Sequence, residues 1–132
     1  MSFEIINPES LGAPRGYSNG VLTESGGRLL FIAGQVGWNE EQEIVDDNLV
    51  RQFDRALANV IAVVEAAGGK PEQIARLVIY VTDVDEYRRC LEEIGRRYRA
   101  RMGKHFPAMA LVEVSSLFED DAKIEIEGTA VL

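Results

Sequence analysis

Residues 105–114, which read HFPAMALVEV, are the stretch that decides the fold of this chain. Side chains of an extended segment alternate between two faces, so Met109, Leu111 and Glu113 share one face. The other face carries the small apolar residues Ala108, Ala110, Val112 and Val114, and we expect it to lie on the core. Two bulky apolar groups beside a carboxylate predict that the first face is either a subunit interface or the wall of a site.

Further β-rich runs lie on both sides of this stretch. They are FEIIN (3–7), YSNGVLTES (17–25), RLLFIAG (28–34), IARLVIYVT (74–82) and KIEIEGTAVL (123–132). The pair Gly26-Gly27 separates the second run from the third, which predicts an antiparallel hairpin with a glycine turn. The nearly continuous apolar character of residues 74–82 predicts a central strand.

Two amphipathic helices are expected between the strands. Asp46 or Asp47 can cap the first, which ends at Gly68-Gly69, and Asp83 or Asp85 opens the second, which ends at Gly103. Apolar residues recur at three- and four-residue steps in both; they are Leu49, Val50, Phe53, Leu57, Val60, Ile61 and Val64, then Val84, Tyr87, Leu91, Ile94, Tyr98 and Met102.

The order of elements predicts one α+β domain over residues 1–132, a mixed β-sheet with both helices on one face. The other face of such a sheet carries apolar side chains, which must be buried against another surface. The open face therefore predicts an oligomer.

The composition of the chain disfavours several classes of binding partner. The 132 residues carry a formal net charge of −8, which disfavours nucleic acid as the default partner. A single cysteine, Cys90, cannot form an internal disulfide, and no apolar run is long enough to span a bilayer. The start MSFEIINPES lacks the features of a signal peptide, so we expect a soluble cytoplasmic protein with no membrane partner.

Several motifs together resemble the RidA/YjgF family. They are YSNGV, FIAGQVGWN, ALANVIAVVEAAGG, VIYVTDVDEY, FPAMALVEV and AKIEIEGTAVL, which occur in the family's order over almost the whole chain. The resemblance implies a chorismate-mutase-like fold packed as a homotrimeric, sheet-lined barrel with clefts between subunits. Members that act as enzymes hydrolyse reactive enamines and imines to a keto acid and ammonia, without a metal or cofactor.

The resemblance also implies that the ligand-binding positions of this chain have changed. The family motif reads F-P-A-R, and its arginine clamps the substrate carboxylate; here that position is Met109, which cannot do so. The family's serine, cysteine and helix asparagine align with Ala33, Leu111 and Leu91, and its G-P-Y aligns with Arg15-Gly16-Tyr17. Tyr17, Gly34 and Glu125 are retained, the last aligning with the carboxylate thought to position the hydrolytic water.

Glu125 and Tyr17 are therefore the candidate catalytic residues. A base at Glu125 needs a raised pKa, and a pocket lined by Met109 and Leu111 would push the pKa upward. The structural alternatives are a solvated or interface carboxylate for Glu125 and a packed rim tyrosine for Tyr17. Two further ligand candidates have similar alternatives: Arg15 is either a replacement cation or a surface arginine, and Trp38 either a ligand contact or a trimer contact.

The remaining reactive residues are predicted to have structural rather than catalytic roles. His105 is the only histidine, with no second ligand pair for a metal, and Cys90 has no histidine partner in the motif. The cations between Arg96 and Lys104 suit a solvated helix end, although some family members have been described as ribonucleases.

Three function classes stay open. The first is a cofactor-free enamine or imine deaminase, with a substrate that is uncharged or anchored by another group. The second is a non-catalytic protein that binds a small apolar metabolite as a sensor or regulator. The third, least favoured by the charge, is an endoribonuclease.

Overall fold

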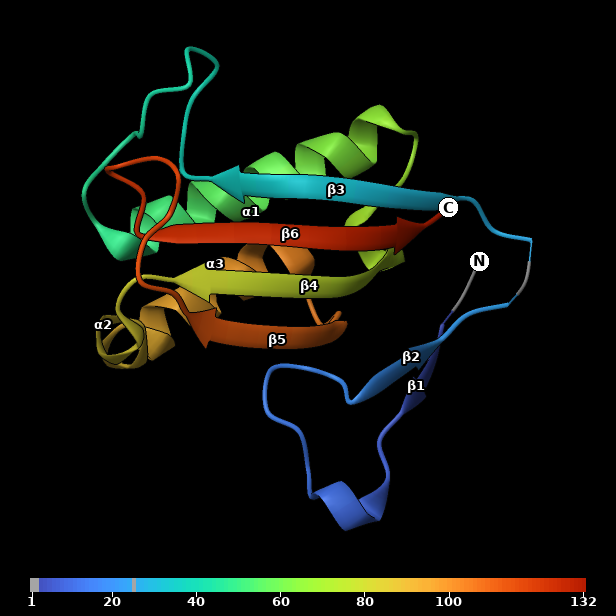
Figure 1. The fold of residues 1–132 in the computed structure, drawn as a ribbon. Helices are drawn as coiled ribbons and strands as arrows, with labels where there is room; N and C mark the ends of the chain where they lie inside the picture. Colours follow the sequence, from blue (N-terminus) through green and yellow to red (C-terminus); the bar gives the residue numbers. More distant parts are fainter. Residues whose placement is uncertain (1–2, 25) are drawn as a thin grey trace.

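The computed structural model describes residues 3–24 and 26–132 and confirms the predicted α+β fold. Its main sheet contains β3 (Leu29–Val36), β6 (Ile124–Val131), β4 (Ile74–Val81) and β5 (Ala108–Glu113), in that order across the sheet (Figure 1). Strand β6 runs antiparallel to β3 and to β4, whereas β4 and β5 are parallel. The sheet is therefore mixed, as the sequence indicates.

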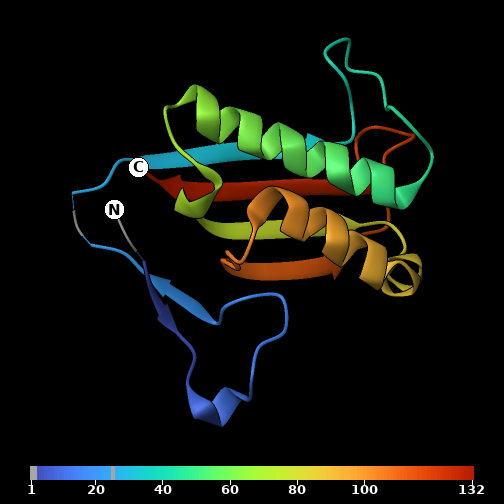
Figure 2. The same cartoon turned by 180° about the vertical axis from the view of Figure 1, so that it is seen from behind.

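All the long helices lie on one face of this sheet, as predicted. The view in Figure 1 shows the sheet with the helices behind it, and Figure 2 shows α1 (Leu49–Ala66) and α3 (Leu91–Met102) in front of it. The short helix α2 (Val84–Arg89) leads into α3. Helix α1 packs on the buried side of β3 and β6, and its residues Phe53, Leu57 and Val60 are almost inaccessible to solvent. No helix in the described ranges is long and apolar enough to cross a membrane.

The helix boundaries differ from the sequence expectation in two places. Asn48, not Asp46 or Asp47, caps α1, and its side chain accepts a hydrogen bond from the Arg51 amide at 3.0 Å. Asp46 instead forms an ion pair with Arg51 at 2.8 Å. The predicted second helix is two helices, because Cys90 leaves helical geometry between α2 and α3.

The predicted hairpin between residues 17–25 and 28–34 is wrong. Strand β2 (Gly20–Leu22) pairs instead with β1 (Glu4–Ile6), and a short 3-10 helix η1 (Glu9–Leu11) lies between them in sequence. We call residues 3–24 the arm; Figure 1 shows it lying beyond β5 and away from β3. Among described residues, β3 pairs only with β6, so its outer edge is free.

Backbone contacts of Ser18 attach the arm to the sheet. Ser18 is buried and forms a parallel bridge with Ala108 at the start of β5. Its amide donates to the Pro107 carbonyl at 3.0 Å and its hydroxyl to the Phe106 carbonyl at 2.5 Å. The glycine pair favoured a local hairpin. Instead, contacts between residues 88 positions apart in the sequence, Ser18 and Phe106, place the arm at the opposite edge of the sheet.

The two faces of β5 are the reverse of the expected ones. Met109 lies in register with Leu77 and Leu111 with Ile79, and both partners on β4 are buried beneath the helices. Met109 and Leu111 therefore face the helices and pack against the core. The small apolar face of β5 is the open one, where Val112 is 43% exposed. Parallel pairing, which the sequence alone does not specify, sets this orientation.

Candidate active site

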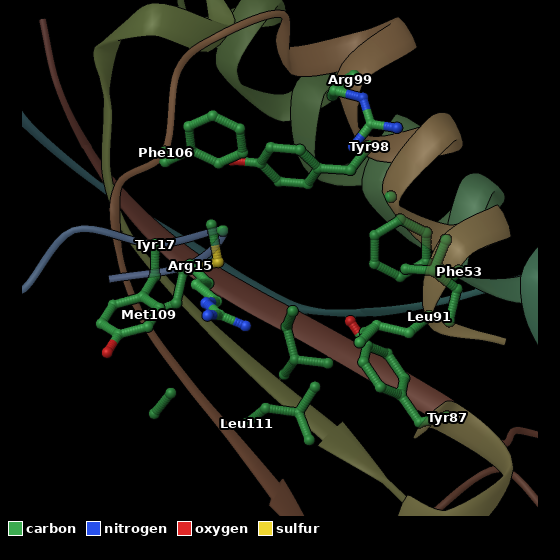
Figure 3. A pocket seen from close by; sticks show the side chains of 15 residues that line it. Arg15, Tyr17, Phe53, Tyr87, Leu91, Tyr98, Arg99, Phe106, Met109 and Leu111 are labelled. Atoms are coloured by element: carbon green, nitrogen blue, oxygen red, sulfur yellow. The ribbon is translucent and has the colours of Figure 1, made fainter. Parts of the chain in front are cut away.

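A cavity of about 540 Å³ lies between the arm, β5 and the helices α2 and α3 (Figure 3). Met109 and Leu111 point into it from β5, so this face of the strand is indeed the wall of a pocket. The lining is mainly apolar, and Phe53, Ile79 and Ile94 form its floor on the core. A volume of this size suits a small organic ligand.

The arm brings two of the predicted residues to this cavity. Arg15 and Tyr17 line it just before the anchor at Ser18, and Figure 3 shows the Arg15 guanidinium among the lining side chains. Tyr17 is 37% exposed, which places it at the rim. Leu91, at the start of α3, lines the same cavity. Arg15, Tyr17, Leu91, Met109 and Leu111 thus come together, although they are scattered in sequence.

The polar side chains of this lining that the sequence interpretation missed as site residues are Tyr87, Tyr98 and Arg99. The tyrosines were assigned to the buried helix stripe, which is correct, but the same face borders the cavity. Burial raises the pKa of Tyr87 to about 12, so its hydroxyl stays protonated at neutral pH. The Tyr98 hydroxyl donates to the His105 carbonyl at 2.6 Å.

Glu125 lies elsewhere, on the open face of the sheet. Its neighbours on β6, Ile124 and Ile126, are fully buried under the helices, so the side chain between them points to the other side. The carboxylate lies against the backbone of β3 at Gly34, where an added Cβ would come within 2.5 Å of Oε2. Ala33 and Gly34 occupy a β-bulge in β3 and are exposed there. A side chain at position 34 would therefore displace the Glu125 carboxylate from this place.

Burial raises the pKa of Glu125, and the nearby carboxylates Glu127 and Glu119 raise it further. The raised pKa and its main cause, burial, agree with the sequence hypothesis, but within one subunit other residues than the expected ones supply this burial. Met109 and Leu111 lie on the helix side and do not line the surroundings of Glu125. On the same face as Glu125, the Tyr80 hydroxyl donates a hydrogen bond to Glu127, which holds that second carboxylate in place.

The candidate residues therefore form two groups on opposite faces of one sheet. The cavity group contains Met109, Leu111, Leu91, Arg15 and Tyr17, and the open-face group contains Glu125, Ala33 and Gly34. Because the sheet separates them, one subunit does not bring the carboxylate of Glu125 to Met109. Trp38 belongs to neither group; it lies in the loop after β3, where its carbonyl accepts from Arg55 and Asn59.

Other polar residues have structural partners. Glu113 accepts a hydrogen bond from the Val84 amide at 2.9 Å, at the start of α2. His105 Nε2 lies 2.7 Å from the Ile74 carbonyl, and its ring stacks on Phe3. Within residues 3–24 and 26–132, no group of three or more His, Cys, Asp or Glu side chains is arranged to hold a metal ion.

The basic cluster on α3 is largely paired. Arg97 and Arg101 both bind Asp54 of α1, at 3.0 and 2.7 Å, and this lowers the pKa of Asp54. Arg96 pairs with Glu92 at 3.1 Å within α3. The pairs with Asp54 join α3 to α1. Together with the pair inside α3 they leave less positive charge for a phosphate backbone, which weakens the ribonuclease alternative.

Comparisons with known proteins give a consistent set of matches. A family model described as endoribonuclease L-PSP matches residues 8–132. The 2-iminobutanoate/2-iminopropanoate deaminase of Escherichia coli K12 is 34% identical over 108 residues, 80% of each chain, and a RutC family protein of Pyrococcus abyssi is 31% identical over 132 residues, 98% of each chain.

Two crystal structures are similar over nearly the whole chain. The Yersinia pestis protein YyfB, described as a conserved Rid family protein of unknown function, is 35% identical with a TM-score of 0.88, covering 100% of both chains. The yjgF gene product of Escherichia coli is 32% identical with a TM-score of 0.68, covering 95% of this chain and 92% of the other. The similarity thus extends over both groups of candidate residues.

Proposed function

Because this chain belongs to the endoribonuclease L-PSP family, which includes the RidA/YjgF proteins, we propose that it is a cofactor-free deaminase of reactive enamines and imines. The membership confirms the resemblance inferred from the sequence motifs. A relative named 2-iminobutanoate/2-iminopropanoate deaminase supports the reaction class. The substrate is atypical, because Met109 stands where the family arginine binds the carboxylate.

The observation that carries the proposal is the placement of Glu125. Its carboxylate lies over Gly34, on a face of the sheet that no helix covers, and burial raises its pKa. A carboxylate of this kind can hold a water molecule and accept its proton. The water oxygen bonds to the imine carbon while Glu125 takes one water proton and passes it to the imine nitrogen, which gives a carbinolamine. Glu125 then takes the carbinolamine hydroxyl proton and delivers it to nitrogen, so that the C=O bond forms, the C–N bond breaks and ammonia leaves. The products are a 2-oxo acid and ammonia.

The two groups of candidate residues would then meet between copies of the chain. In this arrangement, Glu125 and Gly34 of one subunit face the cavity group of the next, within a homotrimer. The open sheet face, which carries Phe31 at 75% exposure, supports an interface at this side of the sheet. Each cleft needs two subunits because each subunit carries the two halves on opposite faces.

A shared cleft predicts complementation between two inactive variants. Glu125→Gln removes the base, and Met109→Glu places a repelling charge in the cavity half. Each variant alone should be inactive, whereas co-expression of the two should restore activity in about a quarter of the clefts, those with both intact halves. The measurement is deamination by the purified mixed oligomer, with each variant expressed singly as the control. No recovery in an oligomer shown by mass spectrometry to be mixed would contradict a shared cleft.

The reaction itself is tested with imines made in the assay. An L-amino-acid oxidase acting on leucine or alanine supplies the 2-imino acid, and semicarbazide traps what remains. We expect the protein to accelerate loss of the leucine-derived imine, and Met109→Arg to shift the preference toward the smaller alanine-derived imine. If only the Met109→Arg variant accelerates either reaction, the natural protein is a non-catalytic binder on a deaminase scaffold. That second function is favoured by the replacement at Met109.

A further inference from the structure

The cavity beside β5 has an unusual electrostatic feature for so acidic a chain. Arg15 and Arg99 both line it, and Figure 3 shows their guanidinium groups on different sides of the cavity. Within the part of the chain that the structure describes, neither guanidinium forms an ion pair. By contrast, Arg51, Arg88, Arg96, Arg97 and Arg101 are all paired with carboxylates. Other arginines among the described residues also lack an ion pair, but Arg15 and Arg99 are the two that line this cavity.

Local structure favours the position of Arg99. Gly95, one turn earlier in α3, also lines the cavity, and a Cβ there would lie 3.1 Å from the Arg99 Nη1. Glycine inside a helix costs about 1 kcal/mol relative to alanine. Its presence at this place leaves space for the Arg99 guanidinium to fold back along the helix toward the cavity.

A third polar group faces the same space. Figure 3 shows the Tyr87 hydroxyl directed into the cavity, and among described residues it forms no hydrogen bond, unlike the hydroxyls of Tyr80 and Tyr98. Half-buried tyrosine hydroxyls usually have a partner. The Tyr87 ring is fixed by edge contact with Phe53, so the donor has a defined position.

We propose that this cavity binds a monocarboxylic acid with a bulky apolar body, and that Arg15 is the group that holds the carboxylate. The apolar body fills the space between Met109, Leu111 and Leu91, and the Tyr87 hydroxyl donates to a polar atom of the ligand. Arg99 adds a weaker attraction from the other side. The proposal deepens the proposed function, since it gives the substrate class of the same site and replaces the family arginine with a residue of the arm.

Size and charge together support this ligand class. A cavity of about 540 Å³ is far larger than a three- or four-carbon acid requires, and its lining is mostly apolar carbon. A guanidinium binds a carboxylate through two parallel hydrogen bonds, which fixes orientation as well as charge. The thioether of Met109, which replaces a charged group, enlarges the apolar part.

Calorimetric titration with three probes tests the proposal without turnover. We expect 3-phenylpropanoate to bind, and both acetate and the neutral 3-phenylpropanamide to bind at least about tenfold more weakly. Arg15→Gln should weaken binding of 3-phenylpropanoate by about tenfold or more, and Arg15→Lys by less, because it keeps the charge and loses the fork. Arg89→Gln, at an exposed arginine of α2 outside the cavity lining, is the matched control and should bind normally.

The outcomes separate this inference from the proposed function. Absence of binding by 3-phenylpropanoate, equal binding of the amide, or full binding by Arg15→Gln each overturns the anchor at Arg15. Imine turnover that depends on Glu125 would survive any of these results. Conversely, the protein could bind the carboxylate through Arg15 and yet hydrolyse no imine. That result would support Arg15 as the carboxylate anchor and would contradict the proposed deaminase function.

Discussion

Replacing Gln52 with leucine is expected to lower the free energy of unfolding by about 3–5 kcal/mol. The side chain is fully buried in α1, and its amide joins three separate backbone groups. Nε2 donates to the carbonyls of Asp46 and Asp121 at 2.8 and 3.1 Å, and Oε1 accepts from the Lys123 amide at 2.8 Å. Leucine has a similar size but removes all three hydrogen bonds.

The measurement is urea unfolding at a fixed protein concentration, because the proposed oligomer would unfold in a concentration-dependent way. Gln35→Leu is the matched control, since Gln35 makes one hydrogen bond, to the carbonyl of Ala33 two residues away. That variant should change the unfolding free energy by less than about 1 kcal/mol. Equal effects of the two substitutions would mean that the bonds of Gln52 contribute little to folding.

Changing Glu125 to glutamine is expected to reduce kcat for imine hydrolysis by about 10²–10⁴ at neutral pH, because an amide cannot accept the proton of water. Burial raises the pKa of Glu125, so the carboxylate forms only above its ordinary titration range. Activity of the natural protein should therefore rise with pH through this raised pKa and level off once Glu125 is ionised. The glutamine variant should lose this rise.

Glu127→Gln is the matched control, a carboxylate on the same strand and face that accepts a hydrogen bond from Tyr80. Its effect on kcat should be small, and it should lower the pH at which activity rises, because Glu127 raises the pKa of Glu125. Stability gives an independent readout. A raised carboxyl pKa in the folded state means that ionisation costs folding energy as pH increases, so Glu125→Gln should not destabilise the protein at neutral pH. An unchanged kcat would remove Glu125 from the mechanism.

Much of the fold could be predicted because it rests on periodicity. The apolar spacing of α1, the alternation in β6 and the stop at Gly103 each follow from local chemistry. The cap at Asn48 and the break at Cys90 were missed, since neighbouring residues offer equivalent local signals and no glycine or proline marks the break. Gln52 was also missed, because a polar residue on a buried stripe shows its partners only in three dimensions.

The site was harder to predict because both faces of β5 are apolar. Alternation shows that Met109 and Val112 lie on opposite faces, but only the parallel register with β4 shows which face meets the helices. Likewise, motif alignment named Glu125 and Met109 together, whereas the sheet separates them in one subunit. Arg15 could be named from sequence as a candidate cation, but its approach to the cavity depends on where the arm docks.

The affinity of the cavity for its ligand depends on the equilibrium between a docked and a detached arm. Its described hydrogen bonds and ring contacts with the rest of the chain are those of Ser18 and the stacking of Phe3 on His105, so we expect it to detach at a lower free-energy cost than the sheet unfolds. Arg15 and Tyr17 leave with it, and the cavity then loses its anchor. An observed dissociation constant therefore combines intrinsic binding with the fraction of docked arms. By thermodynamic linkage, a ligand that contacts the arm must also shift the docking equilibrium of the arm toward the docked state, by the same factor.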